Sequence, residues 1–208
     1  MKFSIANLER ARRNPVEFAK ILKNGDSSAN KFGGYPKSMR WLDAVCEFHR
    51  SGDISDAFDA LEKALGGRKP TAQHRRELQA LLKSLDNYKN EVTSRRLSFI
   101  KSREKIHLRV NEAVEINGIV PLIFMKTAGG FSAYFVSLNN PAWKSELKFP
   151  IVQSYVSESV FKSSVEETDV GYIDYLTGEF NELSFSTSEI AASAVELETI
   201  GQTILLNY

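Results

Sequence analysis

The stretch from Arg40 to Leu65 is RWLDAVCEFHRSGDISDAFDALEKAL, and it predicts two short helices joined by a tight turn. Gly52 can adopt the left-handed conformation that ends one helix, and Asp53 can cap the next. Apolar residues recur at helical spacing on both sides of this turn. Large side chains on the first helix would face small ones on the second: Trp41, Ala44, Val45 and Phe48 against Ala57, Leu61 and Ala64.

This pattern resembles a single tetratricopeptide repeat over residues 38–70. The aromatic, small, Gly-Asp and alanine positions are filled by Trp41, Ala44-Val45, Phe48, Gly52-Asp53, Ala57, Leu61 and Ala64, with Pro70 one residue late. The resemblance implies contact with another protein through a helical groove containing Trp41, Phe48 and Phe58. Only one clear copy occurs in the chain, so an ordinary helical hairpin is the alternative.

Composition predicts a soluble globular protein of one or two domains, because 42% of the 208 residues are hydrophobic and 25% are charged. No apolar run approaches the ~20 residues of a membrane span. The first residues resemble no secretory signal. A single cysteine, Cys46, is typical of a reducing, cytoplasmic setting. The three histidines have no metal-binding spacing with it, so we expect no metal and no cofactor.

Charge is unevenly distributed along the chain. Residues 68–109 carry twelve Lys/Arg against four Asp/Glu, whereas residues 110–208 carry four against thirteen. Clustered cations on one face can neutralise nucleic-acid phosphates. They can also dock an acidic protein surface, pair with the acidic C-terminal half or remain solvated. The candidate contacts are Arg75, Arg76, Lys83, Lys89, Arg95, Arg96, Lys101 and Arg103.

Helices are expected over residues 4–13, from Pro15 to about 23, and from Thr71 to about Phe99. From Lys105 the apolar period changes to two, which predicts a strand that reaches Ile116. Asn117-Gly118 predicts a hairpin turn, and Pro121 would lie near an edge or bulge of the return strand. Further strands are predicted over 131–138, 170–176 and 180–185. Helices are predicted over 150–161 and, after the capping box Ser186–Glu189, to about Leu205.

These elements predict an α+β fold. A helical module (1–70) would precede a long basic helix and a mostly antiparallel sheet of about five strands with flanking helices (71–208). The order helix, three-stranded meander, helix, strand is similar to the core of the restriction-endonuclease-like nucleases. Those enzymes need carboxylates on the second and third strands to hold Mg²⁺. The corresponding stretches here, IVPLIFM and FSAYFVSL, contain none. We therefore predict no catalytic residue.

Two further groups of residues are weaker candidates for chemistry. The acidic residues Glu166, Glu167, Asp169, Asp174 and Glu179 could bind a cation, but solvated carboxylates explain them as well. Cys46 and His49 are an i, i+3 pair, yet no acid that could orient the histidine is evident.

Two functional hypotheses follow, with an unrecognised enzyme as a third. The first is a non-catalytic interaction subunit of a larger bacterial-type assembly, such as a defence or mobile-element complex. The alternative is a nucleic-acid-binding accessory protein that uses the basic helix 71–103, on a nuclease-like core without its metal site. The sequence predicts neither the partner nor the oligomeric state.

Overall fold

The computed structural model describes residues 1–25, 36–65, 71–138 and 141–208. The main helices within these ranges are α1 (Leu8–Arg13), α2 (Pro15–Lys23), α3 (Lys37–Ser51), α4 (Ile54–Leu65), α5 (Ala72–Ser94), α6 (Lys148–Tyr155) and α7 (Thr187–Asn207). A π-helical turn, η4 (Val156–Phe161), extends α6, and short 3₁₀ turns occur at η1 (Ile5–Asn7), η3 (Trp143–Ser145) and η5 (Val165–Glu167). The predicted α+β class is confirmed.

The described strands form one mixed six-stranded sheet. They are β1 (Lys2–Ser4), β2 (Leu97–Arg109), β3 (Glu115–Lys126), β4 (Phe131–Ser137), β5 (Thr168–Asp174) and β6 (Phe180–Leu183). The pairs β2–β3, β3–β4 and β5–β6 are antiparallel, whereas β4–β5 and β1–β3 are parallel. The sheet is therefore less antiparallel than predicted, and it includes a strand at the N-terminal end that the sequence did not predict.

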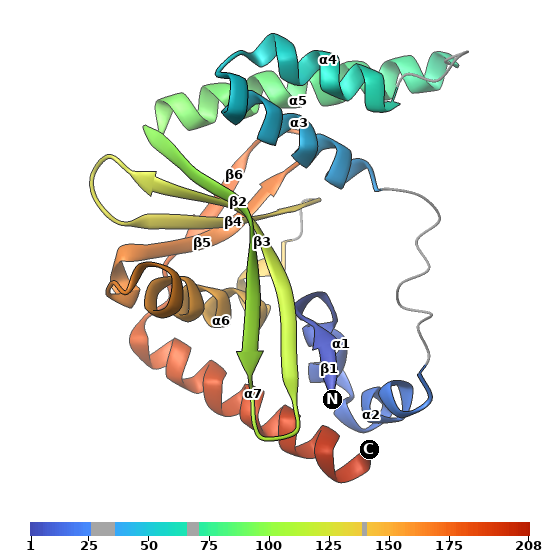
Figure 1. Ribbon diagram of the computed structural model, residues 1–208, viewed down its shortest axis with the longest axis vertical. Coiled ribbons are helices and arrows are strands. Elements are labelled where there is room, and N and C mark those ends of the chain that lie inside the picture. Colours follow the sequence, from blue (N-terminus) through green and yellow to red (C-terminus); the bar gives the residue numbers. More distant parts are fainter. Residues whose placement is uncertain (26–35, 66–70, 139–140) are drawn as a thin grey trace.

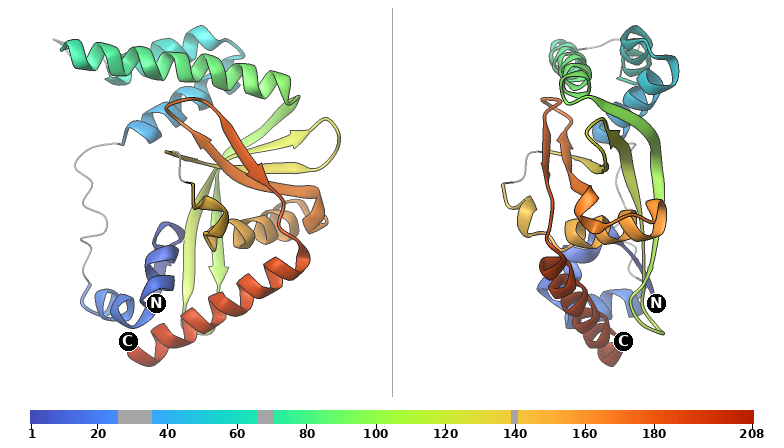
Figure 2. Two further views of the ribbon diagram at one scale, coloured as in Figure 1. Left: turned by 180° about the vertical axis from the view of Figure 1, so that it is seen from behind. Right: turned by 90° about the vertical axis from the view of Figure 1, so that its left-hand side faces the viewer.

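Most helices gather at the two ends of the molecule, while α6 lies between the sheet and α7 (Figures 1 and 2). Helices α3, α4 and α5 cover one end of the sheet, while α1, α2 and α7 lie at the other, together with both chain termini. The long β2–β3 hairpin runs from the first group to the second. Helix α2 packs on α7, and β1 joins the sheet through β3.

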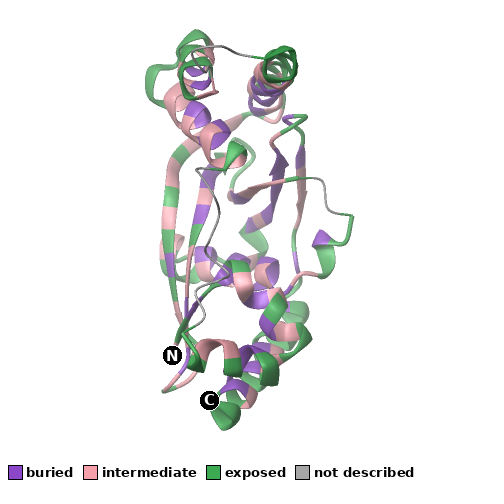
Figure 3. Ribbon diagram, turned by 90° about the vertical axis from the view of Figure 1, so that its right-hand side faces the viewer, coloured by how far each residue is buried: buried purple, intermediate pink, exposed green. Residues whose placement is uncertain are grey.

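Two hydrophobic clusters fill the interior (Figure 3). The helical-hairpin cluster combines α3, α4 and α5 with the sheet and includes Trp41, Leu61 and Phe124. The terminal cluster combines α1, α2, α6 and α7 with the sheet and includes Phe18, Trp143 and Ile123. Consecutive strand residues face opposite sides, so Ile123 and Phe124 place the two clusters on opposite faces there. Residues 1–25 and 36–65 thus belong to different clusters, and the expected module 1–70 is not one packing unit.

Local signals explain most helix boundaries. Gly52 has a φ of 79° and ends α3, as the turn between the two helices predicts. Pro15 begins α2, with the Asn14 side chain accepting a hydrogen bond from the Glu17 backbone N–H. The capping box of Ser186 and Glu189 begins α7 as predicted. The hairpin of the repeat-like stretch is therefore present, while Pro70 lies outside the described residues.

The first two large strands differ from the prediction. Helix α5 ends at Ser94 instead of near Phe99, and β2 begins at Leu97 instead of Lys105. The predicted hairpin turn at Asn117-Gly118 is wrong, because both residues lie inside β3. The chain instead turns at residues 110–114, where the Asn111 Oδ1 accepts hydrogen bonds from the backbone N–H groups of Ala113 and Val114.

Gly118 serves close packing rather than a turn. A Cβ added at this position would lie 2.4 Å from the Cγ2 atom of Ile5, the first residue after β1. The absence of a side chain therefore lets the N-terminal segment lie against the middle of β3.

Candidate functional site

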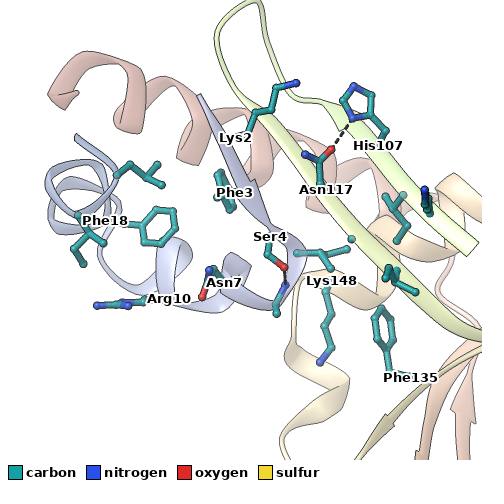
Figure 4. A pocket seen from close by; sticks show the side chains of 18 of the residues that line it. Lys2, Phe3, Ser4, Asn7, Arg10, Phe18, His107, Asn117, Phe135 and Lys148 are labelled. Atoms are coloured by element: carbon teal, nitrogen blue, oxygen red, sulfur yellow. Dashed lines mark hydrogen bonds between the residues drawn. The ribbon is translucent and has the colours of Figure 1, made fainter. Parts of the chain in front are cut away.

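A pocket of about 1010 Å³ lies where the sheet divides (Figure 4). Strand β2 accompanies β3 along one edge, so β1 and β4 must share the other edge. Strand β1 pairs with β3 from Glu115 to Asn117, and β4 pairs with it from Leu122 to Met125. The described pairings leave Gly118 to Pro121 without a strand partner on this edge. Pro121 has no N–H to donate to a neighbour, and the pocket lies in the gap.

The walls of the pocket come from segments that are distant in the sequence. Phe18 of α2 packs edge-on against Phe3 of β1, with ring centroids 5.1 Å apart, and this contact holds α2 over one side. Residues 105–107 of β2 and 117–119 of β3 form the second side. The third side consists of residues 135–137 of β4 together with Lys148 at the start of α6.

The described lining carries positive charge. It contains Lys2, Arg10, Lys105 and Lys148, together with His107, and no aspartate or glutamate is among the described residues that form it. Arg10 and Lys105 are exposed, and neither has an ion pair within the described part of the chain. Two uncompensated cations beside an apolar wall make the pocket suitable for an anion.

The two remaining lysines of the pocket, Lys2 and Lys148, have carboxylate partners outside its lining, and His107 contacts an amide. Lys2 Nζ lies 2.8 Å from Glu115 Oε2, and this contact lowers the pKa of Glu115. His107 Nδ1 lies 2.6 Å from Asn117 Oδ1, which fixes the amide of Asn117. Lys148 Nζ lies 2.6 Å from Glu146 Oε2 and also over the rings of Phe149 and Phe135, 4.8 and 5.2 Å from their centroids.

The predicted groove residues do not form an open groove. Trp41 is fully buried and meets Tyr88 of α5 edge to face, with centroids 5.4 Å apart. Phe48 and Phe58 are half-buried and pack against the same cluster. The apolar face of the α3–α4 hairpin is therefore occupied by α5 and the sheet. Trp41 in particular is not available to another protein.

The predicted basic residues fall into two groups. Arg95 contacts Glu91 and Glu182 at 2.7 and 2.6 Å, Lys101 contacts Glu104 at 2.8 Å, and Arg103 pairs with Asp43. These three cations are neutralised within the fold, and two of them lie on β2 rather than on a helix. The other group consists of exposed Arg75, Arg76, Lys83 and Arg96 and half-buried Lys89, and no ion pair involves them among the described residues.

The weaker constellations serve the fold. Asp169 pairs with Lys126 at 2.7 Å, and Asp174 Oδ1 accepts from the Leu176 N–H in the β5–β6 turn. Hydrogen bonds from Ser164 and Thr187 lower the pKa of Glu166 to about 2. His49 Nε2 lies 2.5 Å from the Tyr88 hydroxyl, so Tyr88 is its polar contact.

The order of elements from α5 through β2, β3, β4 and α6 to β5 is the one expected from the nuclease-like resemblance. Strand β3 begins at Glu115, four residues before the stretch IVPLIFM of the predicted second strand, and Glu115 pairs with Lys2. Strand β4 has no carboxylate in its sequence. Within the described residues there is no cluster of three or more His, Cys, Asp or Glu side chains that could hold a metal ion.

Comparison with known proteins gives no family. No family model matches the chain, and no curated protein shows significant similarity. Among solved structures, one described as "Crystal structure of SSO0001" aligns with 92% of this chain and 85% of its own, at 9% identity and a TM-score of 0.29. So low a score carries no conclusion about fold or function. No helix in the described ranges is long and apolar enough to cross a bilayer.

Sequence reasoning missed the pocket because its lining comes from β1, α1, α2, β2, β3, β4 and α6. Its longest continuous stretch is residues 2–7, and the other lining residues come from segments far apart in the sequence. The one available signal was Pro121, which predicted an edge or bulge near the point where β4 separates from β3.

Proposed function

We propose that this protein binds nucleic acid as an accessory protein, and that the pocket between β1, β3 and β4 is its main contact. The observation that carries the proposal is the described lining, with four Lys/Arg side chains and no carboxylate. Phosphates are attracted to such a site, and each neutralised phosphate releases counterions. The apolar wall adds contact surface for the sugar and base of a nucleotide, which a free inorganic phosphate does not have.

The exposed cations of α5 would be a secondary contact. Arg75, Arg76 and Lys83 lie on the solvent side of that helix, at the other end of the molecule from β1. They are separated from the pocket by the sheet, so the two groups do not make one continuous patch. The pocket therefore gives a sharper test than the helix that the sequence favoured.

The test compares two double variants by fluorescence anisotropy with labelled oligonucleotides. Arg10→Gln with Lys105→Gln removes the two uncompensated cations of the pocket, and Arg75→Gln with Arg76→Gln is the matched control on α5. Wild-type affinity should fall steeply between 50 and 200 mM salt. The pocket variant should bind more weakly, and its salt slope should be smaller by about 2, because each phosphate contact contributes about one unit.

Two results would contradict the proposal. One is an absence of oligonucleotide binding at 50 mM salt. The other is full binding by the pocket variant, whether or not the α5 variant binds. Both variants replace exposed side chains, so their thermal unfolding midpoints should match the wild type and exclude misfolding as the cause.

A second candidate function is an interaction subunit, and the outer face of α7 favours it. Val195 and Leu206 are 66% and 83% exposed on this helix. A helix with apolar residues on its outer side is typical of one that another protein covers. This surface replaces the α3–α4 groove as the proposed contact.

The test is affinity capture from the native host after nuclease treatment. Val195→Glu with Leu206→Glu should lose a specific protein that the control Glu198→Gln keeps. Equal capture by both variants would exclude α7 as the interface.

A further inference from the structure

The aromatic ring of Phe135 and the ammonium group of Lys148 lie side by side in the pocket (Figure 4). The Phe135 ring is half-buried and meets Phe149 edge to face, with centroids 5.7 Å apart. The Lys148 side chain is 22% exposed, and its Nζ lies 5.2 Å from the Phe135 centroid. The pairing of β4 with β3 ends at Tyr134, one residue before Phe135. In the described pairings, the edge of β4 that faces the pocket therefore has no strand partner at Phe135.

Polar groups that can recognise a base lie around the same space. Asn117 uses its Oδ1 atom toward His107, which leaves the amide N–H groups available to an acceptor. Asn7 and Ser137 also line the pocket. Gly118 and Ile119, which lie on the part of the β3 edge without a strand partner, also line the pocket. Hydrogen-bonding edges beside an aromatic ring are the combination by which proteins hold splayed-out bases.

The position of Lys148 suits a phosphate. The Lys148 ammonium lies over the rings of Phe135 and Phe149, and Glu146 is its one ion-pair partner among the described residues. A phosphate oxygen at the pocket side would give this cation a second anionic partner. Arg10 and Lys105 lie at the exposed part of the lining, where phosphates of adjoining nucleotides would pass.

We infer that the pocket holds an unpaired nucleotide, with its base against Phe135 and its phosphate at Lys148. This inference rests on the proposed function and narrows it. A duplex keeps its bases stacked inside and offers only groove edges and phosphates. A concave site with a recessed ring therefore selects a nucleotide that is free of a partner strand. The nucleotide can belong to a single strand or be a free nucleoside monophosphate, since both present the same base and phosphate.

The experiment measures anisotropy with a labelled single-stranded oligonucleotide, the matching duplex and unlabelled nucleoside monophosphates as competitors. Phe135→Leu removes the ring and keeps an apolar side chain. It should weaken single-strand binding about tenfold, as loss of one stacked base does. Phe131→Leu is the matched control, because Phe131 lies on the same strand but stacks on Phe161 away from the pocket.

Lys148→Gln and Phe135→Tyr keep the test decisive if Phe135→Leu proves unstable. Lys148→Gln should weaken binding and lower the salt slope by about one, whereas Phe135→Tyr should bind like the wild type. Competition by a mononucleotide at the affinity of the strand would identify a free nucleotide as the ligand. Much weaker competition would identify a single strand, and either outcome supports the inference.

Two results would overturn the inference of an unpaired nucleotide. One is equal affinity for duplex and single strand, and the other is full binding by both Phe135→Leu and Lys148→Gln. The broader proposal is tested separately by the Arg10 and Lys105 variant. If that variant loses binding while Phe135→Leu does not, the protein binds nucleic acid by its phosphates alone. If neither variant loses binding, both proposals fail.

Discussion

His49 shows how burial changes the chemistry of one side chain. It stacks on Phe99, with ring centroids 4.2 Å apart, and contacts the Tyr88 hydroxyl. Burial penalises the imidazolium and lowers the pKa of His49 to about 4, from 6.5. The same burial explains why the Cys46–His49 pair is better understood as packing than as a nucleophile and its base. His49 is neutral at pH 7 and supports the aromatic packing between α3 and the sheet.

This pKa has a defined effect on stability. The unfolded chain binds a proton at His49 near pH 6.5, while the folded protein does so only near pH 4. Folding is therefore most favoured above pH 6.5, and stability is lost as the pH falls from 6.5 toward 4. His49 should contribute about 2 kcal/mol of destabilisation between pH 7.5 and pH 5. Urea unfolding at the two pH values should show this loss in the wild type and in His107→Gln, an exposed control. His49→Gln should show a smaller loss, and an unchanged pH dependence in this variant would contradict the assignment.

The junction between α5 and β2 depends on one residue in an unusual conformation. Arg96 follows the helix with a φ of 52°, which is unfavourable for a residue with a Cβ and common for glycine at this place after a helix. Its backbone carbonyl accepts hydrogen bonds from the N–H and hydroxyl of Thr127, so the conformation is held by the neighbouring hairpin.

Arg96→Gly should therefore raise the free energy of unfolding by about 0.5 to 1 kcal/mol. The matched control is Arg76→Gly, an exposed position inside α5, which should lower it by about 1 kcal/mol. Urea denaturation measures both. A loss of stability in Arg96→Gly as large as in the control would show that the left-handed conformation at Arg96 carries no strain.

Helix ends could be predicted because their signals are local. Gly52, Pro15 and the pair Ser186 and Glu189 act through backbone groups within a few residues of themselves, and each one appears where the sequence placed it. The strands near Gly118 could not be predicted in the same way. Whether an Asn-Gly pair turns or continues depends on what packs against it, and here the packing residue is Ile5.

The candidate site could not be predicted for a related reason. Of its four Lys/Arg side chains, only Lys105 belongs to the basic stretch of the sequence. Lys2, Arg10 and Lys148 lie outside that stretch. Meanwhile Arg95 and Arg103, which belong to the basic stretch, are neutralised by carboxylates brought to them by the fold. Sequence charge therefore predicts a contact with anions mainly on α5, which lies at the other end of the molecule from β1 and the pocket beside it.

The molecule as a whole has two hydrophobic clusters that share one sheet. Strand β3 contributes Ile123 to the terminal cluster and Phe124 to the helical-hairpin cluster. Since adjacent residues of one strand belong to the two clusters, loss of one cluster removes the support for β3 in the other. We therefore expect the described parts to unfold as one cooperative unit. This holds although the chain termini and the α3–α4 hairpin lie at opposite ends of the sheet.

The two tryptophans of the chain report on the clusters separately, because Trp41 is buried in the helical-hairpin cluster and Trp143 in the terminal cluster. Trp143→Phe leaves Trp41 as the only tryptophan, and Trp41→Phe leaves Trp143, so excitation selective for tryptophan reports on one cluster at a time. Leu61→Ala, added to each background, creates a cavity in the helical-hairpin cluster alone and should cost about 2 to 5 kcal/mol. If unfolding is cooperative, the denaturant midpoint should fall by a similar amount with both reporters. A fall seen by Trp41 while Trp143 keeps its midpoint would mean that the clusters unfold independently, and that the sheet between them holds together when the helical hairpin is lost.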